Sequence, residues 1–290
     1  MTAKGREAGA IALRGRVKSY GILPGFGLTL GTTMLYLGFI VIIPLSALFI
    51  KSARIDAHTL LVQLGSRRTI SAFSLSISAS FYAAVFDAVF GLLVAWTLIR
   101  YRFFGRRVVD SLIDLPFALP TAVAGISLTA LYSNTGWMGR LLEPLGIKVA
   151  YTPLGITLAL AFIGLPFVVR TVQPVLDACS KDVEQAAASL GARPLTIFFR
   201  VILPEIVPAI LTGSALAFAR GLGEYGSVVF ISGNMPLKTE IVPLLIMTKL
   251  EQFDYVSASA IAVVFLLVSF CIVFSINLLQ WLSRKKYGEA

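Results

Sequence analysis

Long stretches without a single charged side chain constrain the fold of this chain more than any other feature. Asp, Glu, Lys and Arg are absent from Ser19–Ile50, Leu115–Gly139, Val149–Val169 and Tyr255–Ser283. A helix needs about 20 apolar residues to cross the hydrocarbon core of a bilayer, and each run reaches that length. Only 14% of the residues are charged and 57% are hydrophobic, whereas soluble domains carry about 25% charged residues. We therefore predict an all-α integral membrane protein.

A fifth predicted span contains one acidic residue. Thr69–Phe86 is uncharged, and the apolar character continues beyond Asp87 to Ile99. A charge inside a span is costly and often marks a functional position. Asp87 therefore has two interpretations: it faces a partner helix, or it lies near the end of a loop.

The sixth span depends on two shorter uncharged runs, Ile206–Ala219 and Tyr225–Leu237, each too short to cross alone. They form either one long helix that carries Arg220 and Glu224, or two separate spans. Lys and Arg concentrate in cytoplasmic loops, so their distribution decides between the two. With six spans and both termini in the cytoplasm, 16 of the 25 Lys and Arg residues lie inside and 8 outside. We therefore prefer six spans.

This topology divides the chain into a basic cytoplasmic N-terminus (1–26), a first transmembrane helix (27–50), a main membrane domain (70–282) and a cytoplasmic tail (283–290). The net charge of +10 is then explained by basic residues beside the membrane, which orient the protein and contact anionic lipid. We therefore expect no nucleic-acid binding. The two cysteines predict neither a disulfide framework nor a metal site.

The stretch "ARGLGEYGSVVF" contains Gly221, Gly223 and Gly226 in a G-x-G-x-x-G pattern. A dinucleotide-binding turn needs a strand before this pattern, but a membrane helix precedes it here, so we reject that interpretation. Arg220 and Glu224 stand four residues apart and would share a helical face, while the glycines leave the helix deformable. The pair either lines a pathway or gate, which we favour, or lies at the interface with its side chains reaching water.

A polar interval between Arg170 and Arg200 predicts a small helical hairpin on the cytoplasmic side. Ser180 is a suitable N-cap for a first helix, and Gly191 is suited to its C-terminal end. Pro194 can open a second helix, because the first helical position needs no backbone N–H.

The segment "EQAAASLGARPLTIFFRVILPEIVPA" resembles the cytoplasmic EAA loop of bacterial ABC importer permeases, here at about 177–204. The family pattern falls on Gln185, Ala186, Ala187, Gly191, Val201, Leu203 and Pro204. Gln185 stands where the family usually has Glu, and Val201 where it usually has Ile. The first departure weakens the case for a salt bridge from that position to an ATPase, although the adjacent Glu184 can substitute.

The stretches "YRFFGR", "DLPFALPTAVAG", "LPFVVRTVQPVL", "LGEYGSVVFISGN" and "FDYVSASAIA" extend the resemblance from about Pro24 onwards. Together they resemble the sulfate/thiosulfate permease subunits of such importers, while molybdate/tungstate permeases share the EAA loop and a similar "LGE-G" stretch. The resemblance implies a six-helix type I permease bundle, with 70–282 as the type-1 permease domain.

The resemblance also implies a transport subunit without chemistry of its own, placed in the inner membrane as half of a translocation pathway. Its partners would be a second homologous permease, two ATP-binding subunits and a periplasmic sulfate-binding protein. The chain has no Walker A pattern, G-x-x-x-x-G-K-[ST], so ATP and Mg²⁺ are expected on the partner ATPase and no cofactor on this chain. The residues implied in ATPase coupling are Glu184, Gln185, Ala186, Ala187, Gly191, Leu203 and Pro204.

Two rival classes remain open. An ion-coupled secondary transporter would use Asp87, Arg220 and Glu224 as its relay. An integral-membrane enzyme is the other, but no His/Cys cluster or nucleophile motif supports it.

Overall fold

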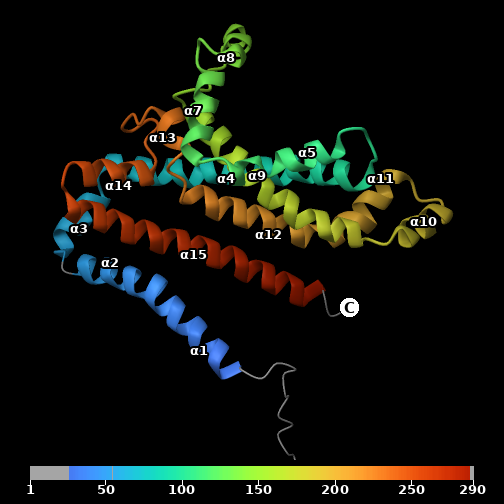
Figure 1. The fold of residues 1–290 in the computed structure, drawn as a ribbon, viewed down its shortest axis with the longest axis horizontal. Coiled ribbons are helices and arrows are strands. Elements are labelled where there is room, and N and C mark those ends of the chain that lie inside the picture. The colour runs from blue at the N-terminus through green and yellow to red at the C-terminus, as the bar shows by residue number, and fades with distance from the viewer. Residues whose placement is uncertain (1–25, 54, 288–290) are drawn as a thin grey trace, which may run out of the picture. The chain divides into compact units, whose positions relative to one another are not determined.

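The computed structural model describes residues 26–53 and 55–287, with side chains described except at positions 51, 57, 279 and 281–287. The expected basic N-terminus lies outside the described residues up to position 25, as does the end of the expected tail from position 288. Every described element is a helix (Figure 1). The all-α prediction is therefore confirmed.

The helices follow one another along the described chain as 15 α-helices, two π-helical turns (η1 and η3) and one 3₁₀ turn (η2). They are α1 (Phe26–Leu37), η1 (Gly38–Ile42), α2 (Ile43–Ala53), α3 (Ala57–Leu64), α4 (Arg67–Arg100), α5 (Arg106–Ile113), α6 (Leu115–Ala118), α7 (Thr121–Tyr132), α8 (Trp137–Leu142), η2 (Glu143–Leu145), α9 (Pro153–Ala178), α10 (Lys181–Ser189), α11 (Pro194–Ile197), η3 (Phe198–Ile202), α12 (Leu203–Leu222), α13 (Val228–Ser232), α14 (Val242–Glu251) and α15 (Tyr255–Tyr287). Among the described residues, five stretches are long and apolar enough to cross a membrane: Phe26–Ile50, Arg67–Arg100, Pro153–Ala178, Pro194–Leu222 and Tyr255–Leu278.

The chain divides into two compact units at Ile50. The described part of the first unit consists of α1, η1 and the beginning of α2, which together form an uninterrupted helical stretch of 25 residues. No charged residue occurs between Phe26 and Ile50, so this stretch has the length and composition of a membrane span.

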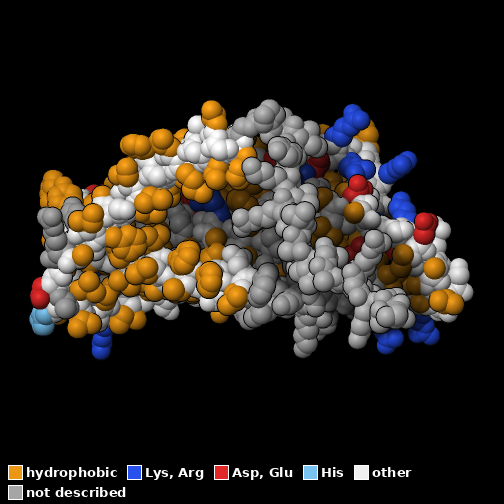
Figure 2. Space-filling view, turned by 90° about the horizontal axis from the view of Figure 1, so that it is seen from below, with side chains coloured by type: hydrophobic (Ala, Val, Ile, Leu, Met, Phe, Trp, Pro, Cys, Tyr) orange, Lys and Arg blue, Asp and Glu red, His pale blue; other side chains and the backbone are white. Residues whose placement is uncertain are grey.

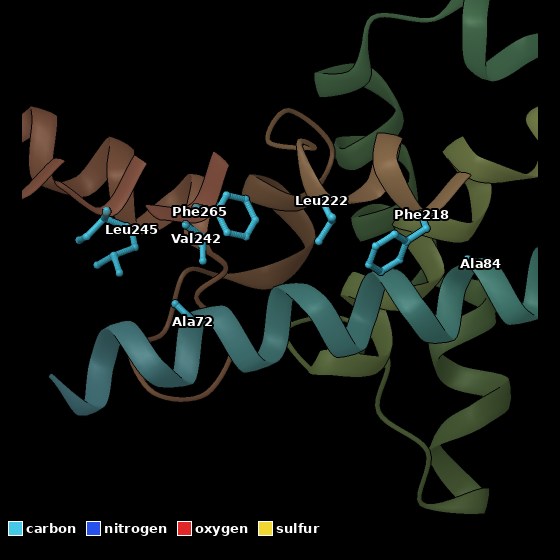
Figure 3. Packing of buried hydrophobic residues seen from close by; sticks show 8 residues of the cluster. Ala72, Ala84, Phe218, Leu222, Val242, Leu245 and Phe265 are labelled. Carbon is cyan, nitrogen blue, oxygen red and sulfur yellow. The ribbon is translucent and has the colours of Figure 1, made fainter. Parts of the chain in front are cut away.

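The second unit is built on three long helices, α4, α9 and α12, that pack against one another, with α15 lying along α12 and α14 (Figure 1). One buried cluster joins these helices, and Figure 3 shows its side chains converging between α4, α12, α14 and α15. Its buried members are Ala72, Ala84, Phe218, Leu222, Val242, Leu245, Ile261 and Phe265.

Glycines allow the three central helices to approach closely. A Cβ placed on Gly213 of α12 would lie 2.7 Å from the Cα of Val168 in α9. Small residues at helix contacts let two backbones approach in this way within membranes, where packing replaces the hydrophobic effect as the driving force. Replacing Gly213 would therefore force α9 and α12 apart.

The third predicted span is not continuous. Instead of one helix over Leu115–Gly139, the structure has the four-residue α6, the 12-residue apolar α7 and the separate α8. The break after α6 occurs at Leu119, whose backbone is extended (φ −85°, ψ 137°). A residue before proline avoids the helical conformation, and Pro120 follows. Five long helices are therefore present among the described residues, but the third predicted span is only this interrupted segment, so the count of six full-length spans is not confirmed.

The last part of the predicted sixth span also differs from expectation. α11 passes through the π turn η3 into α12, which ends at Leu222. One helix through Glu224 is therefore wrong, and the five-residue α13 is too short to be a second span.

Candidate functional site

The predicted hairpin between α9 and α12 is present. The Ser180 Oγ accepts a hydrogen bond from the backbone N–H of Asp182 at 3.2 Å and caps α10. Gly191 has φ +82°, a left-handed conformation that glycine adopts without strain. Pro194 is the first residue of α11, as predicted. The local sequence signals therefore shape the hairpin.

The hairpin exposes large apolar side chains at its tip and sides. Leu190, next to the turn, is 89% exposed, and Val183, Leu195 and Phe199 are also exposed. Of the residues implied in ATPase coupling, Gln185, Ala186, Gly191 and Pro204 are exposed, whereas Ala187 and Leu203 are half-buried. An exposed apolar patch on a loop indicates a surface for protein contact. Figure 2 shows Lys and Arg side chains gathered toward the same end of the molecule.

One ion pair fastens the hairpin to the end of α4. The Nη2 of Arg100, the last residue of α4, lies 2.5 Å from the Glu184 Oε1, and the Glu184 side chain is 25% exposed. The Arg100 guanidinium also lies over the ring of Trp96, 5.3 Å from its centroid. Glu184 is thus engaged within the chain by Arg100. No local sequence pattern indicates this contact, which joins residues 84 positions apart.

A cavity of about 430 Å³ lies beside this ion pair, between the end of α4 and the hairpin. Its lining residues are Trp96, Arg100, Lys181, Glu184, Gln185, Ala188, Pro194, Ile197, Phe198 and Ile202. The hairpin therefore stands over a partly polar recess at the end of the bundle.

The ion pair predicted between Arg220 and Glu224 is also present. The Arg220 Nη1 and the Glu224 Oε2 are 2.6 Å apart. The Glu224 side chain is only 2% exposed, and its Oε1 accepts hydrogen bonds from both the backbone N–H and the Oγ of Ser227. Arg220 lies in the last turn of α12, but Glu224 lies beyond the helix end. The shared helical face was therefore wrong, although the pairing is right.

The three glycines around this pair differ in their surroundings. A Cβ on Gly226 would overlap the Oγ1 of Thr121 at the start of α7, and one on Gly221 would lie 3.2 Å from the Oγ of Ser80 in α4. Gly223 has nothing within 4 Å of an added Cβ. Two of the glycines thus allow close packing, which places the turn bearing Glu224 directly against α7.

A second charged cluster was missed by sequence reasoning, which counted Arg170 among loop residues. Arg170 lies within α9 and binds the carboxylates of Asp110 at 2.7 Å and Asp114 at 2.5 Å. Burial alone would raise the pKa of Asp110, but hydrogen bonds from Arg170 and Gln173 lower it below the ordinary value. These contacts fix α5 and its C-terminal end to α9.

Asp87 is fully buried in α4, with 0% of its surface exposed. Neither carboxylate oxygen has a hydrogen-bond partner among the described residues. A Cβ on Gly164 of α9 would overlap the Asp87 Oδ2. Of the two interpretations, the structure favours the one in which Asp87 faces a neighbouring helix.

The chain resembles known transport proteins over most of its length. Residues 88–287 match the family model described as "Binding-protein-dependent transport system inner membrane component". The "Sulfate transport system permease protein CysT" of Salmonella typhimurium is 49% identical over 264 residues, covering 91% of this chain and 95% of the relative. The protein of the same description from Synechococcus elongatus is 49% identical over 253 residues, covering 87% of this chain and 91% of the relative.

Solved structures support the fold. A chain of a bacterial ABC transporter involved in import of the acidic polysaccharide alginate superimposes with a TM-score of 0.72 at 17% identity, over 87% of this chain and 93% of that chain. The inward-facing MetNI methionine ABC transporter gives a TM-score of 0.55 at 16% identity, over 73% of this chain and 94% of that chain. With a family match over more than half of its length and close relatives along nearly all of it, this chain belongs to the family of binding-protein-dependent transport system inner membrane components.

Proposed function

We propose that this chain is the permease subunit of an ATP-driven importer that carries sulfate or thiosulfate across the inner membrane. The observation that supports sulfate as the substrate is the similarity to sulfate transport permeases, which are about half identical over about nine-tenths of the chain. The chain acts as a transport component and not as an enzyme. Molybdate or tungstate is the alternative cargo, since permeases for those anions share the EAA loop.

The hairpin formed by α10 and α11 docks on a cytoplasmic ATP-binding subunit. Its exposed apolar side chains, such as Leu190 and Leu195, supply the contact, and the ion pair between Arg100 and Glu184 transmits displacement of the hairpin to α4. Rigid-body motion of helices is a common way to switch a site between two sides. ATP and Mg²⁺ bind to that partner.

The assembled importer contains this chain, a second homologous permease, two ATP-binding subunits and a periplasmic sulfate-binding protein. The end with α10 and α11 faces the cytoplasm and both termini lie there. The basic side chains gathered at that end support this orientation, because Lys and Arg concentrate on the cytoplasmic side. Arg220 and Glu224 lie toward the opposite end of α12 and line or gate the pathway.

The proposal is tested by reconstituting the complete complex with its binding protein in proteoliposomes and measuring uptake of radiolabelled sulfate. Uptake should require ATP and should stop when the partner ATPase is inactivated by mutation. Excess thiosulfate should compete with labelled sulfate and excess molybdate should not. Competition by molybdate alone would assign the chain to the other anion class. Uptake driven by an ion gradient without ATP would establish a secondary transporter instead.

A further inference from the structure

A positively charged cavity of about 470 Å³ lies at the N-terminal end of α4, away from the hairpin. It is lined by Arg67, Ile70, Ser71, Ser74, Leu75, Ser78 and Lys238. Lys238 comes from the loop between α13 and α14, and the other residues belong to α4. Among the described residues, the two charged lining side chains are both cationic, and no Asp or Glu lines the cavity. Such a recess attracts anions.

The polar residues of α4 in this cavity lie on one face of the helix. Arg67, Ser71, Ser74 and Ser78 are spaced by four, three and four residues, which is the spacing of a single helical face. The Ser74 hydroxyl forms no hydrogen bond among the described residues, and the Ser78 hydroxyl makes only a long bond, 3.3 Å, to the Leu75 carbonyl. Both hydroxyls can therefore rotate to donate a hydrogen bond into the cavity.

The loop that carries Lys238 is held firmly in place. The carbonyl of Met235 accepts hydrogen bonds from the backbone N–H groups of Lys238, Thr239 and Glu240. Leu237 has φ +65°, a conformation that costs energy for a residue other than glycine and persists only where the surroundings enforce it. The Ser71 Oγ donates to the Leu237 carbonyl at 3.2 Å, which fixes the loop onto α4.

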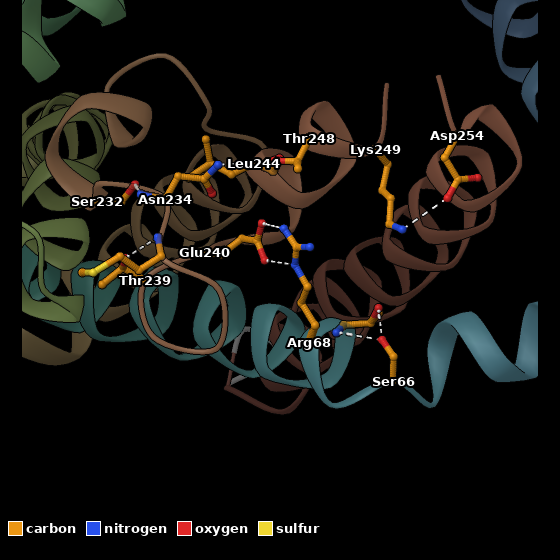
Figure 4. A network of polar contacts seen from close by, with 12 residues as sticks. Ser66, Arg68, Ser232, Asn234, Thr239, Glu240, Leu244, Thr248, Lys249 and Asp254 are labelled. Carbon is orange, nitrogen blue, oxygen red and sulfur yellow. Dashed lines mark hydrogen bonds and ion pairs between the residues drawn. The ribbon is translucent and has the colours of Figure 1, made fainter. Parts of the chain in front are cut away.

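A second anchor lies two residues further on. Arg68 binds Glu240 through both carboxylate oxygens, at 2.7 Å and 2.6 Å, and the Glu240 side chain is 1% exposed (Figure 4). This bidentate pair engages both carboxylate oxygens of Glu240. Arg67 and Lys238 form no ion pair among the described residues. The cavity therefore keeps two uncompensated positive charges on a rigid frame.

We infer that this cavity is an entry site for a divalent tetrahedral oxyanion. Arg67 and Lys238 supply two positive charges for the two negative charges of the anion, and the hydroxyls of Ser74 and Ser78 donate hydrogen bonds to its oxygens. The inference rests on the proposed function, which makes this end of α4 periplasmic and sulfate the cargo. Ser78 and Leu75 also line an adjoining apolar cavity of about 540 Å³ between α4 and α9, so the polar face ends there. The site thus captures the anion at the mouth of the pathway.

The test uses a cysteine at Ser74 as a probe of anion occupancy. Ser74→Cys is introduced into the assembled transporter after Cys179→Ala and Cys271→Ala have removed the two native thiols. The rate of modification by an anionic methanethiosulfonate is compared with that by its cationic analogue, with and without sulfate. We expect the anionic reagent to react about tenfold faster than the cationic one, and sulfate to slow it in a saturable manner.

Matched variants identify the charges that cause the preference for the anionic reagent and the protection by sulfate. Adding Arg67→Ala and Lys238→Ala should abolish the preference for the anionic reagent and raise the protecting sulfate concentration by about tenfold or more. Arg67→Lys with Lys238→Arg should restore both effects. Lys148→Ala, which removes a positive charge from the loop between η2 and α9, outside the cavity lining, should leave them unchanged. Equal reagent rates in the parent protein, or an equal effect of Lys148→Ala, would overturn the inference.

The phosphate of a lipid headgroup offers the same chemistry as free sulfate. The measurement is therefore repeated in liposomes of phosphatidylcholine alone and with added phosphatidylglycerol. Sulfate protection in both supports the site, whereas protection by phosphatidylglycerol with no effect of sulfate refutes capture of the transported anion. Uptake by the same complex separates the two proposals. If the parent protein imports no sulfate, the proposed function fails; if it imports sulfate but shows no protection at Ser74→Cys, only the entry site fails.

Discussion

The ion pair between Arg220 and Glu224 gives the sharpest prediction about the bundle. Arg220→Ala leaves a 2% exposed carboxylate with only the two neutral donors of Ser227. Breaking a buried pair from one side costs about 3–5 kcal/mol. Because the Arg220 side chain is 36% exposed and two donors remain, we expect a loss of about 2–3 kcal/mol in the free energy of unfolding.

Removing both charges should be less damaging than removing Arg220 alone. The double variant Arg220→Ala with Glu224→Ala contains no stranded carboxylate, so about 1–2 kcal/mol should return as a coupling energy. Membrane abundance should therefore recover in part. Transport should follow a different order: Arg220→Ala abolishes sulfate uptake, Glu224→Ala reduces it less or makes the pathway leaky, and the double variant regains abundance without full uptake.

The assay separates stability from transport. Thermal unfolding in detergent and quantitative immunoblotting of membranes report on the fold, while labelled-sulfate uptake per inserted protein and ATPase activity report on function. Normal uptake and normal abundance of Arg220→Ala would refute the pathway role. Additive losses in the double variant would show that Glu224 is not stabilised by Arg220.

Three further predictions address coupling, topology and chemical reactivity. Gly191→Asp places a side chain where φ is +82° and should leave the protein inserted but abolish uptake, whereas Gln185→Ala should reduce uptake less. Normal uptake by Gly191→Asp would contradict docking through the hairpin. A reporter fused after Ala290 that is active only in the periplasm should stay silent, and a strong signal would reverse the predicted orientation of the C-terminus. Burial is the main cause, and a hydrogen bond to Glu205 the second, that raises the pKa of the Cys179 thiol to about 11. In a Cys271→Ala variant, this thiol should therefore resist maleimide at pH 7 and react faster only as the pH approaches 11. Rapid labelling at pH 7 would show that the thiol is accessible and ionised.

Local signals in the sequence predicted the hairpin well because they act within a few residues. Ser180, Gly191 and Pro194 each satisfy a backbone requirement of their own helix end, and the structure uses all three as expected. The ion pair between Arg100 and Glu184 could not be found in this way, because it joins two elements that only the folded bundle brings together.

The membrane spans also combine features that the sequence predicts with features that it does not. Runs of uncharged residues located the long helices, but such runs report hydrophobicity and not continuity. They therefore missed the break at Leu119, where Pro120 enforces an extended backbone. They also ended the run Val149–Val169 before Arg170, because Arg170 is charged. In the structure α9 continues to Ala178, and the carboxylates of Asp110 and Asp114 pair with Arg170.

The π turn at Phe198–Ile202 has a consequence for how the segment between the hairpin and α12 can change in evolution. A π turn is a local interruption that accommodates one residue more than the corresponding α turn. Deleting one residue there would let an ordinary α-helix run through with little rotation of the hairpin relative to α12, because the turn already absorbs the extra residue. A deletion within the regular turns of α12 would instead rotate everything before it by about 100° about the helix axis. Glu184 would then turn away from Arg100 even though no side chain had been altered. Changes in length between Gly191 and Leu222 should therefore be tolerated best at this π turn.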